Sequence, residues 1–177
     1  MKYFLLLAAL TLPLEARAAL PPKMEHPSLV VYKQQRRMEL YSGTALVKVY
    51  RIALGLNPVP PKRKQGDYAT PEGVYRTCGK VPHSSYAQAL ILNYPNAEDA
   101  ERGLKEGIIS RKQHAAILAA MRANQCPPFG TRLGGQIEIH GEGSQSDWTW
   151  GCIALDNPDI KELFAALANG TRVTIKP

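Results

Sequence analysis

Apolar and polar residues alternate along residues 29–54, which is the pattern of strands with one buried face. The alternation predicts strands at Leu29–Tyr32, Met38–Tyr41 and Ala45–Leu54. The polar stretches QQRR and SGT separate these runs and are typical of tight turns. We therefore expect a three-stranded antiparallel meander at this end of the chain.

A segment rich in proline, glycine and charge follows the meander, with the sequence LNPVPPKRKQGDYATPEG. Each proline disfavours helical geometry at the residue before it, so the segment predicts a long loop. Loops of this length usually carry function. Its densest charge cluster, Lys62-Arg63-Lys64, is interpreted as a solvated basic stretch.

The middle of the chain predicts two strands and then two helices. The strands are Val74–Cys78 and the apolar run in QALILNYP. Asn96 begins the first helix, AEDAERGLKEG, which Gly107 ends. Ser110 and Gln113 form a capping-box pattern ahead of HAAILAAMRAN, the second helix.

The last third predicts strands at Gln136–His140 and Cys152–Leu155, a helix, and a final strand in TRVTI. Asn157 is expected to cap the helix, with Pro158 in its first position and Gly170 beyond its end. Its apolar residues repeat at helical spacing: Ile160, Leu163, Phe164 and Leu167. The predicted fold class is α+β and predominantly β, with strands enclosing the core and two or three helices covering one side.

The first 18 residues have the organisation of a secretory signal peptide. Lys2 precedes an apolar run from Tyr3 to Leu14, and the small-x-small sequence Ala16-Arg17-Ala18 follows. The run is too short to span a bilayer comfortably. We therefore expect a signal peptide at 1–18, an exported soluble protein without stable membrane insertion, and a single domain over 19–177.

The formal net charge of +7 is spread along the sequence. A nucleic-acid-binding protein would need a basic face with aromatic platforms or a recognition helix, and neither pattern is present. Export also argues against such a partner. A positive surface outside the cytoplasm suits an anionic cell-wall polymer instead.

The chain has three cysteines, an odd number that leaves at least one thiol unpaired within the chain. In an oxidising compartment an unpaired thiol needs a reason. Cys78 follows a strand-like run and Cys126 follows a helix, so these two are candidates for a surface disulfide. Position alone leaves it equally open that both are free. With that pair joined, Cys152 would be the remaining free thiol.

The stretch IEIHGEGSQSDWTWGCIALDN brings a possible nucleophile and base together. Alternation places His140 at the end of a strand on the face opposite Ile139, and Gly151 allows an unusual backbone turn before Cys152. Acyl transfer by a thiolate uses such a pair, because a neighbouring imidazole lowers the pKa of the thiol and takes its proton. A buried structural thiol is about equally consistent with the spacing, since cysteine is among the most buried residue types.

Further groups near this pair fit acyl transfer. The carbonyl of Gly141 can orient the imidazole, and the peptide N–H groups of Gly151 and Cys152 can form an oxyanion hole. No CxxC or HExxH motif is present, so we expect no metal site.

The segments IHG and DWTWGCIALDN, with GD-x-x-TPEG-x-Y upstream and GTRVTI downstream, resemble the YkuD-type L,D-transpeptidase catalytic domain. The resemblance runs from Leu29 to Ile175 and points to a branch with murein L,D-transpeptidase-like and L,D-carboxypeptidase-like members. It implies a sandwich-like fold of mixed sheets, a periplasmic location and no cofactor. It also implies that Cys152 is the nucleophile, His140 the base and Gly141 its orienting group.

The resemblance implies a substrate as well. Family enzymes act on peptidoglycan stem peptides after the L-centre of meso-diaminopimelate, through a thioester. An amine acceptor then gives a cross-link, while water gives an L,D-carboxypeptidase or a murein–lipoprotein amidase, and these outcomes stay open. A non-catalytic cell-wall binding module is the competing class. We expect a monomer whose partner is peptidoglycan, with an outer-membrane lipoprotein left open as a second partner.

Two positions depart from the commoner pattern of the family. Trp150 stands where a second histidine is usual, and Ala154 stands where an arginine is usual. Another basic group would have to recognise the substrate carboxylate, and Arg132 is the candidate. The other expected substrate-binding residues are Thr149, Trp150, Tyr86 and Ser85.

Overall fold

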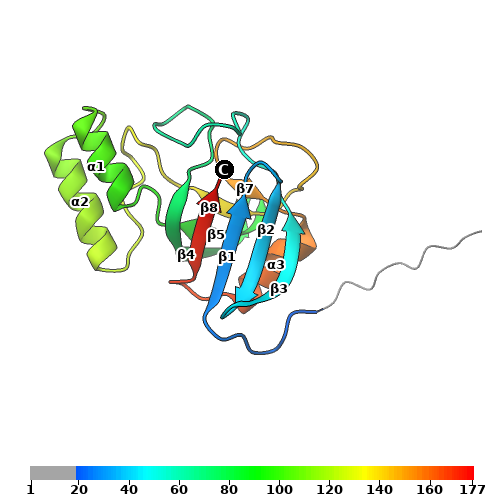
Figure 1. The fold of residues 1–177 in the computed structure, drawn as a ribbon. Helices are drawn as coiled ribbons and strands as arrows, with labels where there is room; N and C mark the ends of the chain where they lie inside the picture. The colour runs from blue at the N-terminus through cyan, green and yellow to red at the C-terminus, as the bar shows by residue number, and fades with distance from the viewer. Residues whose placement is uncertain (1–18) are drawn as a thin grey trace, which may run out of the picture.

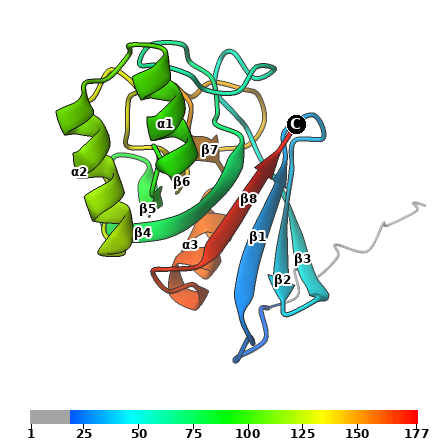
Figure 2. The same ribbon diagram turned by 60° about the vertical axis from the view of Figure 1, so that its left-hand side comes forward.

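The computed structural model describes residues 19–177, so the predicted signal peptide lies outside the described residues. Across 19–177, eight strands form one curled mixed sheet accompanied by three helices (Figures 1 and 2). The strand order is β3-β2-β1-β8-β4-β5-β6-β7. The predicted fold class, α+β with more strand than helix, is confirmed. No helix within 19–177 has the length and apolar character needed to cross a membrane.

The strands are β1 (Pro27–Tyr32), β2 (Arg37–Ser42), β3 (Ala45–Arg51), β4 (Gly73–Ser84), β5 (Ala87–Leu92), β6 (Glu138–His140), β7 (Ile153–Ala154) and β8 (Arg172–Lys176). The helices are α1 (Ala97–Lys105), α2 (Arg111–Arg122) and α3 (Asn157–Ala166). β1 pairs with β8 and β6 with β7 in parallel, and the other neighbours are antiparallel.

The predicted meander is confirmed by the antiparallel pairing of β1, β2 and β3. The third strand ends at Arg51, earlier than predicted, because the chain then leaves β2 and crosses to the other end of the sheet. There Ala53 forms a bridge with Ala154, and Gly55 forms one with Thr149. These bridges join the segment after β3 to β7 and to the residues just before β7. The two ends of the curled sheet therefore meet.

β4 is the longest strand and bends the sheet. Its first residues pair with β8 and the rest pair with β5. It extends beyond Cys78, where the predicted strand ends, and passes through Gly79 and Pro82, two residue types that are unfavourable within strands. Register shifts between Thr77 and Gly79, and between Val81 and Ser84, let the strand continue through both residues.

The main core lies between the curled sheet and α3, where Ile160 and Leu163 of the helix and Leu167 just after it join buried residues of the strands. The predicted cap of this helix is wrong: Asp156 occupies the N-cap position and makes no side-chain cap hydrogen bond. Asn157 is unavailable as a cap because its Oδ1 accepts the N–H of Glu142, at 2.8 Å.

α1 and α2 lie beside the sheet and pack against each other around a small second core of Ala100, Ile109, Ile117 and Leu133 (Figure 2). Both helices begin with complete capping boxes, from Asn96 and from Ser110, which confirms the predicted helix start at Asn96 and the predicted box at Ser110. The disulfide between Cys78 and Cys126 ties the segment after α2 to β4. This pairing and the free thiol of Cys152 are both confirmed.

Candidate active site

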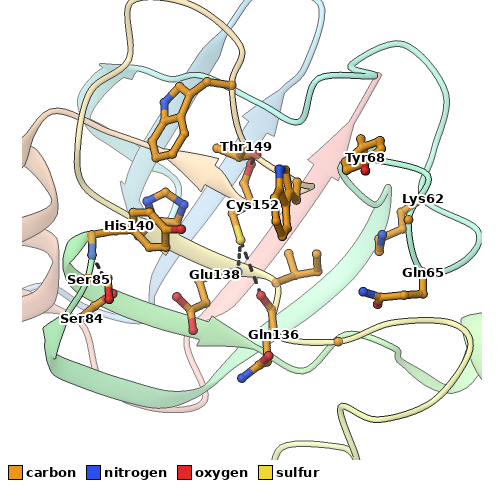
Figure 3. A pocket seen from close by; sticks show the side chains of 16 residues that line it. Lys62, Gln65, Tyr68, Ser84, Ser85, Gln136, Glu138, His140, Thr149 and Cys152 are labelled. Carbon is orange, nitrogen blue, oxygen red and sulfur yellow. Dashed lines mark hydrogen bonds between the residues drawn. The ribbon is translucent and has the colours of Figure 1, made fainter.

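A cleft of about 670 Å³ opens where the two ends of the sheet meet. Its walls come from the long loop before β4, the turn between β4 and β5, β6 with the residues before it, and the segment leading to β7 (Figure 3). The lining includes both residues of the predicted catalytic pair, His140 and Cys152. The predicted functional loop therefore does form part of the cleft, although it lies far from Cys152 in the sequence.

His140 ends β6 with its side chain held from several sides. The residue is 1% exposed, and its Nδ1 lies 2.8 Å from the carbonyl oxygen of Gly141. Because a carbonyl can only accept, Nδ1 carries the proton and the neutral ring has its lone pair on Nε2. Tyr86 stacks on the ring with centroids 4.7 Å apart, and Trp148 meets it edge-on at 5.5 Å. The ring plane and the tautomer are thus both set by neighbours.

Gly141 can only be a glycine in this arrangement. A Cβ at this position would lie 2.3 Å from Oδ1 of Asn157 and 3.0 Å from the carbonyl oxygen of Tyr86. The N–H of Gly141 donates to that same Tyr86 carbonyl, at 2.9 Å. The start of α3 and the turn before β5 therefore hold the Gly141 carbonyl in place beneath the imidazole of His140.

The half-buried thiol of Cys152 contacts the backbone of the residues leading into β6 (Figure 3). Its Sγ lies 3.5 Å from the carbonyl oxygen of Gln136, to which it donates, and 3.4 Å from the amide nitrogen of Glu138, which donates to it. No hydrogen bond within residues 19–177 joins Sγ to His140. The thiol and the imidazole therefore line the same cleft without a hydrogen bond between them.

Thr149 fixes the turn that presents Cys152. Its Oγ1 donates to the carbonyl oxygen of Cys152 at 2.8 Å and accepts the N–H of Gly151 at 3.1 Å. Gly151 has φ of 130°, and a Cβ there would lie 2.7 Å from the carbonyl oxygen of Ala69. The unusual backbone expected at this glycine is confirmed, and the long loop is the element that requires it.

The resting pair is neutral. Burial raises the pKa of the Cys152 thiol to about 12, and of the nearby charges the Glu138 carboxylate raises it further while Lys62 lowers it. Burial also lowers the pKa of His140, against the opposing effect of its hydrogen bond to Gly141. The expectation of a lowered thiol pKa is wrong for this geometry, because removal of the thiolate from water outweighs its few favourable contacts.

A family model described as the YkuD L,D-transpeptidase catalytic domain matches residues 26–175. The chain belongs to this family. Among curated proteins, the YkuD-family chain is 26% identical over 140 residues to YafK of Escherichia coli (strain K12), named "Putative L,D-transpeptidase YafK". That match covers 76% of this chain and 44% of YafK, so the chain spans less than half of its relative.

Solved structures with the YkuD-family fold resemble this one over most of its length. Pgp2 of Campylobacter jejuni, described as a helical cell shape determining protein, has a TM-score of 0.59 at 23% identity and covers 86% of this chain and 48% of its own. Bd1075 of Bdellovibrio bacteriovorus has a TM-score of 0.55 at 22% identity, with the same coverage of 86% and 48%. At these identities the likeness shows the fold alone.

The expected substrate-binding residues of this YkuD-family domain divide into two groups. Ser85, Tyr86 and Trp150 line the cleft, and Trp150 is 77% exposed. Thr149 also lines it, but its hydroxyl is engaged with Gly151 and Cys152, so it serves as a brace within the turn. Arg132 is exposed and lies outside the lining residues. The predicted contact of Arg132 with substrate therefore has no support from the lining of this cleft and stays a prediction.

Lys62 is the basic side chain among the described residues that line the cleft. Its side chain is only 3% exposed, and its Nζ lies 2.8 Å from Oδ1 of Asp67 and 3.1 Å from the carbonyl oxygen of Lys64. The interpretation of Lys62-Arg63-Lys64 as solvated is wrong at Lys62, because other residues of the same loop surround its ammonium group. A lysine followed by an aspartate five residues later was the available signal for this pairing.

The predicted oxyanion donors also need correction. The amide of Gly151 already donates to Oγ1 of Thr149, so it is not free to bind a substrate oxygen. The amide of Cys152 makes no hydrogen bond within residues 19–177 and is the donor that remains.

One lining residue was not selected from the sequence, namely Glu138. Alternation along IEIH places it on the same strand face as His140, two residues away, so the signal was present. Burial raises the pKa of its carboxyl group. Among residues 19–177 no cluster of three or more histidine, cysteine, aspartate or glutamate side chains is arranged to hold a metal ion.

Proposed function

We propose that this YkuD-family domain is an exported, periplasmic cysteine acyltransferase that acts on peptidoglycan stem peptides after the L-centre of meso-diaminopimelate. The observation that carries the proposal is one cleft containing a free thiol, Cys152, and a histidine, His140, whose Nε2 is available as a base. Family membership supports this reaction class. The domain has the same fold as Pgp2, a cell-shape determinant, and a role in cell-wall remodelling fits that likeness.

Acylation begins when Cys152 Sγ turns from the Gln136 carbonyl toward the substrate and His140. Nε2 takes the thiol proton as Sγ attacks the carbonyl carbon, and the Cys152 N–H stabilises the oxygen that becomes negative. The C–N bond then breaks, the leaving amine takes the proton from His140, and a thioester remains on Cys152. A histidine with a lowered pKa suits this role, because it is neutral before the step and able to accept a proton.

The second half-reaction determines the product. An acceptor amine attacks the thioester and gives a cross-link, with His140 taking its proton and returning it to the departing thiolate. Water in the same position gives the hydrolytic product of an L,D-carboxypeptidase, or releases a lipoprotein joined to murein. We take transpeptidation as the primary function, and the same assay distinguishes the hydrolytic outcomes.

The test uses purified protein, disaccharide-tetrapeptide muropeptides and mass spectrometry of the products. Wild type is expected to release the terminal D-alanine, and Cys152→Ala and His140→Ala are expected to lose this activity. His114→Ala, on α2 beside Glu101 and outside the residues that line the cleft, is the matched histidine control and should keep full activity. Products identical in wild type and Cys152→Ala, across free stems, intact sacculi and lipoprotein-linked murein, would favour a binding module instead.

A further inference from the structure

Glu138 lies in the cleft next to the nucleophile. Its own amide donates to Sγ of Cys152, and its side chain lines the same cavity as His140 (Figure 3). No ion pair or hydrogen bond to its carboxylate is present within residues 19–177. A half-buried carboxylate without a partner beside a reactive group is costly, so its retention needs a physical reason.

Two other partly buried carboxylates in this domain have cationic partners. Glu72 pairs with Lys33 at 2.6 Å, and Asp99 pairs with Arg102 at 3.0 Å. Among the described lining residues of the cleft, Lys62 is the one lysine or arginine, and it is committed to Asp67. Desolvation alone raises the pKa of Glu138, with no cation acting to lower it. The charge of Glu138 is therefore left uncompensated by the protein.

This charge opposes the chemistry proposed for the site. A carboxylate beside Cys152 disfavours the thiolate and any negative charge that develops next to it, and it raises the thiol pKa in the resting protein. A cation delivered by the substrate would satisfy the carboxylate and remove this opposition in one step. A primary ammonium group fits, because it offers three donors and a compact positive charge.

We propose that Glu138 is a specificity-determining residue that binds a primary ammonium group on the side chain of the acyl donor, so that the thiol of Cys152 becomes reactive when that group is present. The inference rests on the proposed function and assigns the residue that recognises the second amino group of its substrate. The donor is a peptide whose reacting residue carries a second, free amino group, as diaminopimelate does. A donor whose second amine is already acylated lacks the cation and is a poor substrate.

The test compares two donors that differ only in N-acetylation of the second amine, with wild type, Glu138→Gln and the control Glu98→Gln on the exposed surface of α1. We expect wild type and Glu98→Gln to prefer the free amine by about 10- to 100-fold in kcat/KM, as for a charge-assisted hydrogen bond. Glu138→Gln should lose most of this preference. Glu138→Asp, which keeps the charge, should retain part of it.

A substrate-free measurement separates recognition from a merely structural role. The pH midpoint of iodoacetamide alkylation at Cys152 should fall by about half a unit or more in Glu138→Gln, because a like charge has been removed. An unchanged midpoint together with an unchanged donor preference would overturn the role of Glu138 while leaving the proposed function intact. Failure of wild type to turn over either donor would overturn both.

Discussion

The disulfide between Cys78 and Cys126 offers a quantitative test of how the helical pair is held to the sheet. The two cysteines are 48 residues apart in sequence, and the bond joins β4 to the segment after α2. In the chain-entropy description, a closed loop of this length destabilises the unfolded state by roughly 4 kcal/mol at 25 °C. Both cysteines are half-buried, so serine at the two positions keeps contact with water and adds little further cost.

The perturbation is the double variant Cys78→Ser/Cys126→Ser, followed by thermal unfolding with circular dichroism. For a domain of this size, roughly 4 kcal/mol corresponds to a fall in Tm of roughly 8–16 °C. Wild type treated with reductant should show the same fall, while Cys152→Ala should keep the wild-type Tm within a few degrees. A Tm in the double variant within about 2 °C of wild type would refute the stabilisation assigned to this bond.

Three further predictions concern the cleft. Thr149→Val leaves the Gly151 amide and the Cys152 carbonyl without their partner and should cost about 1–3 kcal/mol in urea unfolding, whereas an unchanged midpoint would show that the hydroxyl is no brace. Gly141→Ala places a Cβ 2.3 Å from Asn157 Oδ1 and should lower kcat roughly tenfold or more. Adding Asn157→Ala should restore part of the activity. Full activity in the single variant would contradict this steric clash. Alkylation of Cys152 should rise with pH up to about 12, because the neutral thiol must lose its proton, and a midpoint below pH 8.5 would mean that the free protein holds a thiolate.

The sequence predicts those parts of the fold that depend on local patterns. The meander follows from alternation, and the capping box at Ser110 follows from the type of residue three positions later. The helix cap at α3 was misassigned because Asp156 and Asn157 are both good caps, and the choice depends on the distant contact of Asn157 with Glu142. A contact made by a loop twelve or more residues away leaves no local pattern to read.

The same distinction applies to the site. The placement of His140 at a strand end, the carbonyl of Gly141 beneath it and the turn at Gly151 were predicted, because strand alternation and glycine positions are visible in the local sequence. The burial of Lys62 was not predicted, because it depends on the conformation of the loop that brings Asp67 to its ammonium group. The raised pKa of Cys152 was not predicted either, because desolvation depends on every element that packs around the thiol.

The central claim is that Cys152 carries the acyl group during the reaction. Intact-protein mass spectrometry of wild type mixed with a tetrapeptide stem and quenched in acid tests this most directly. We predict a mass increase equal to the donor tripeptide acyl group, mapped to Cys152, removed by hydroxylamine and absent from Cys152→Ala. Product formation by wild type that persists undiminished in Cys152→Ala, with no adduct at this residue, would contradict the claim.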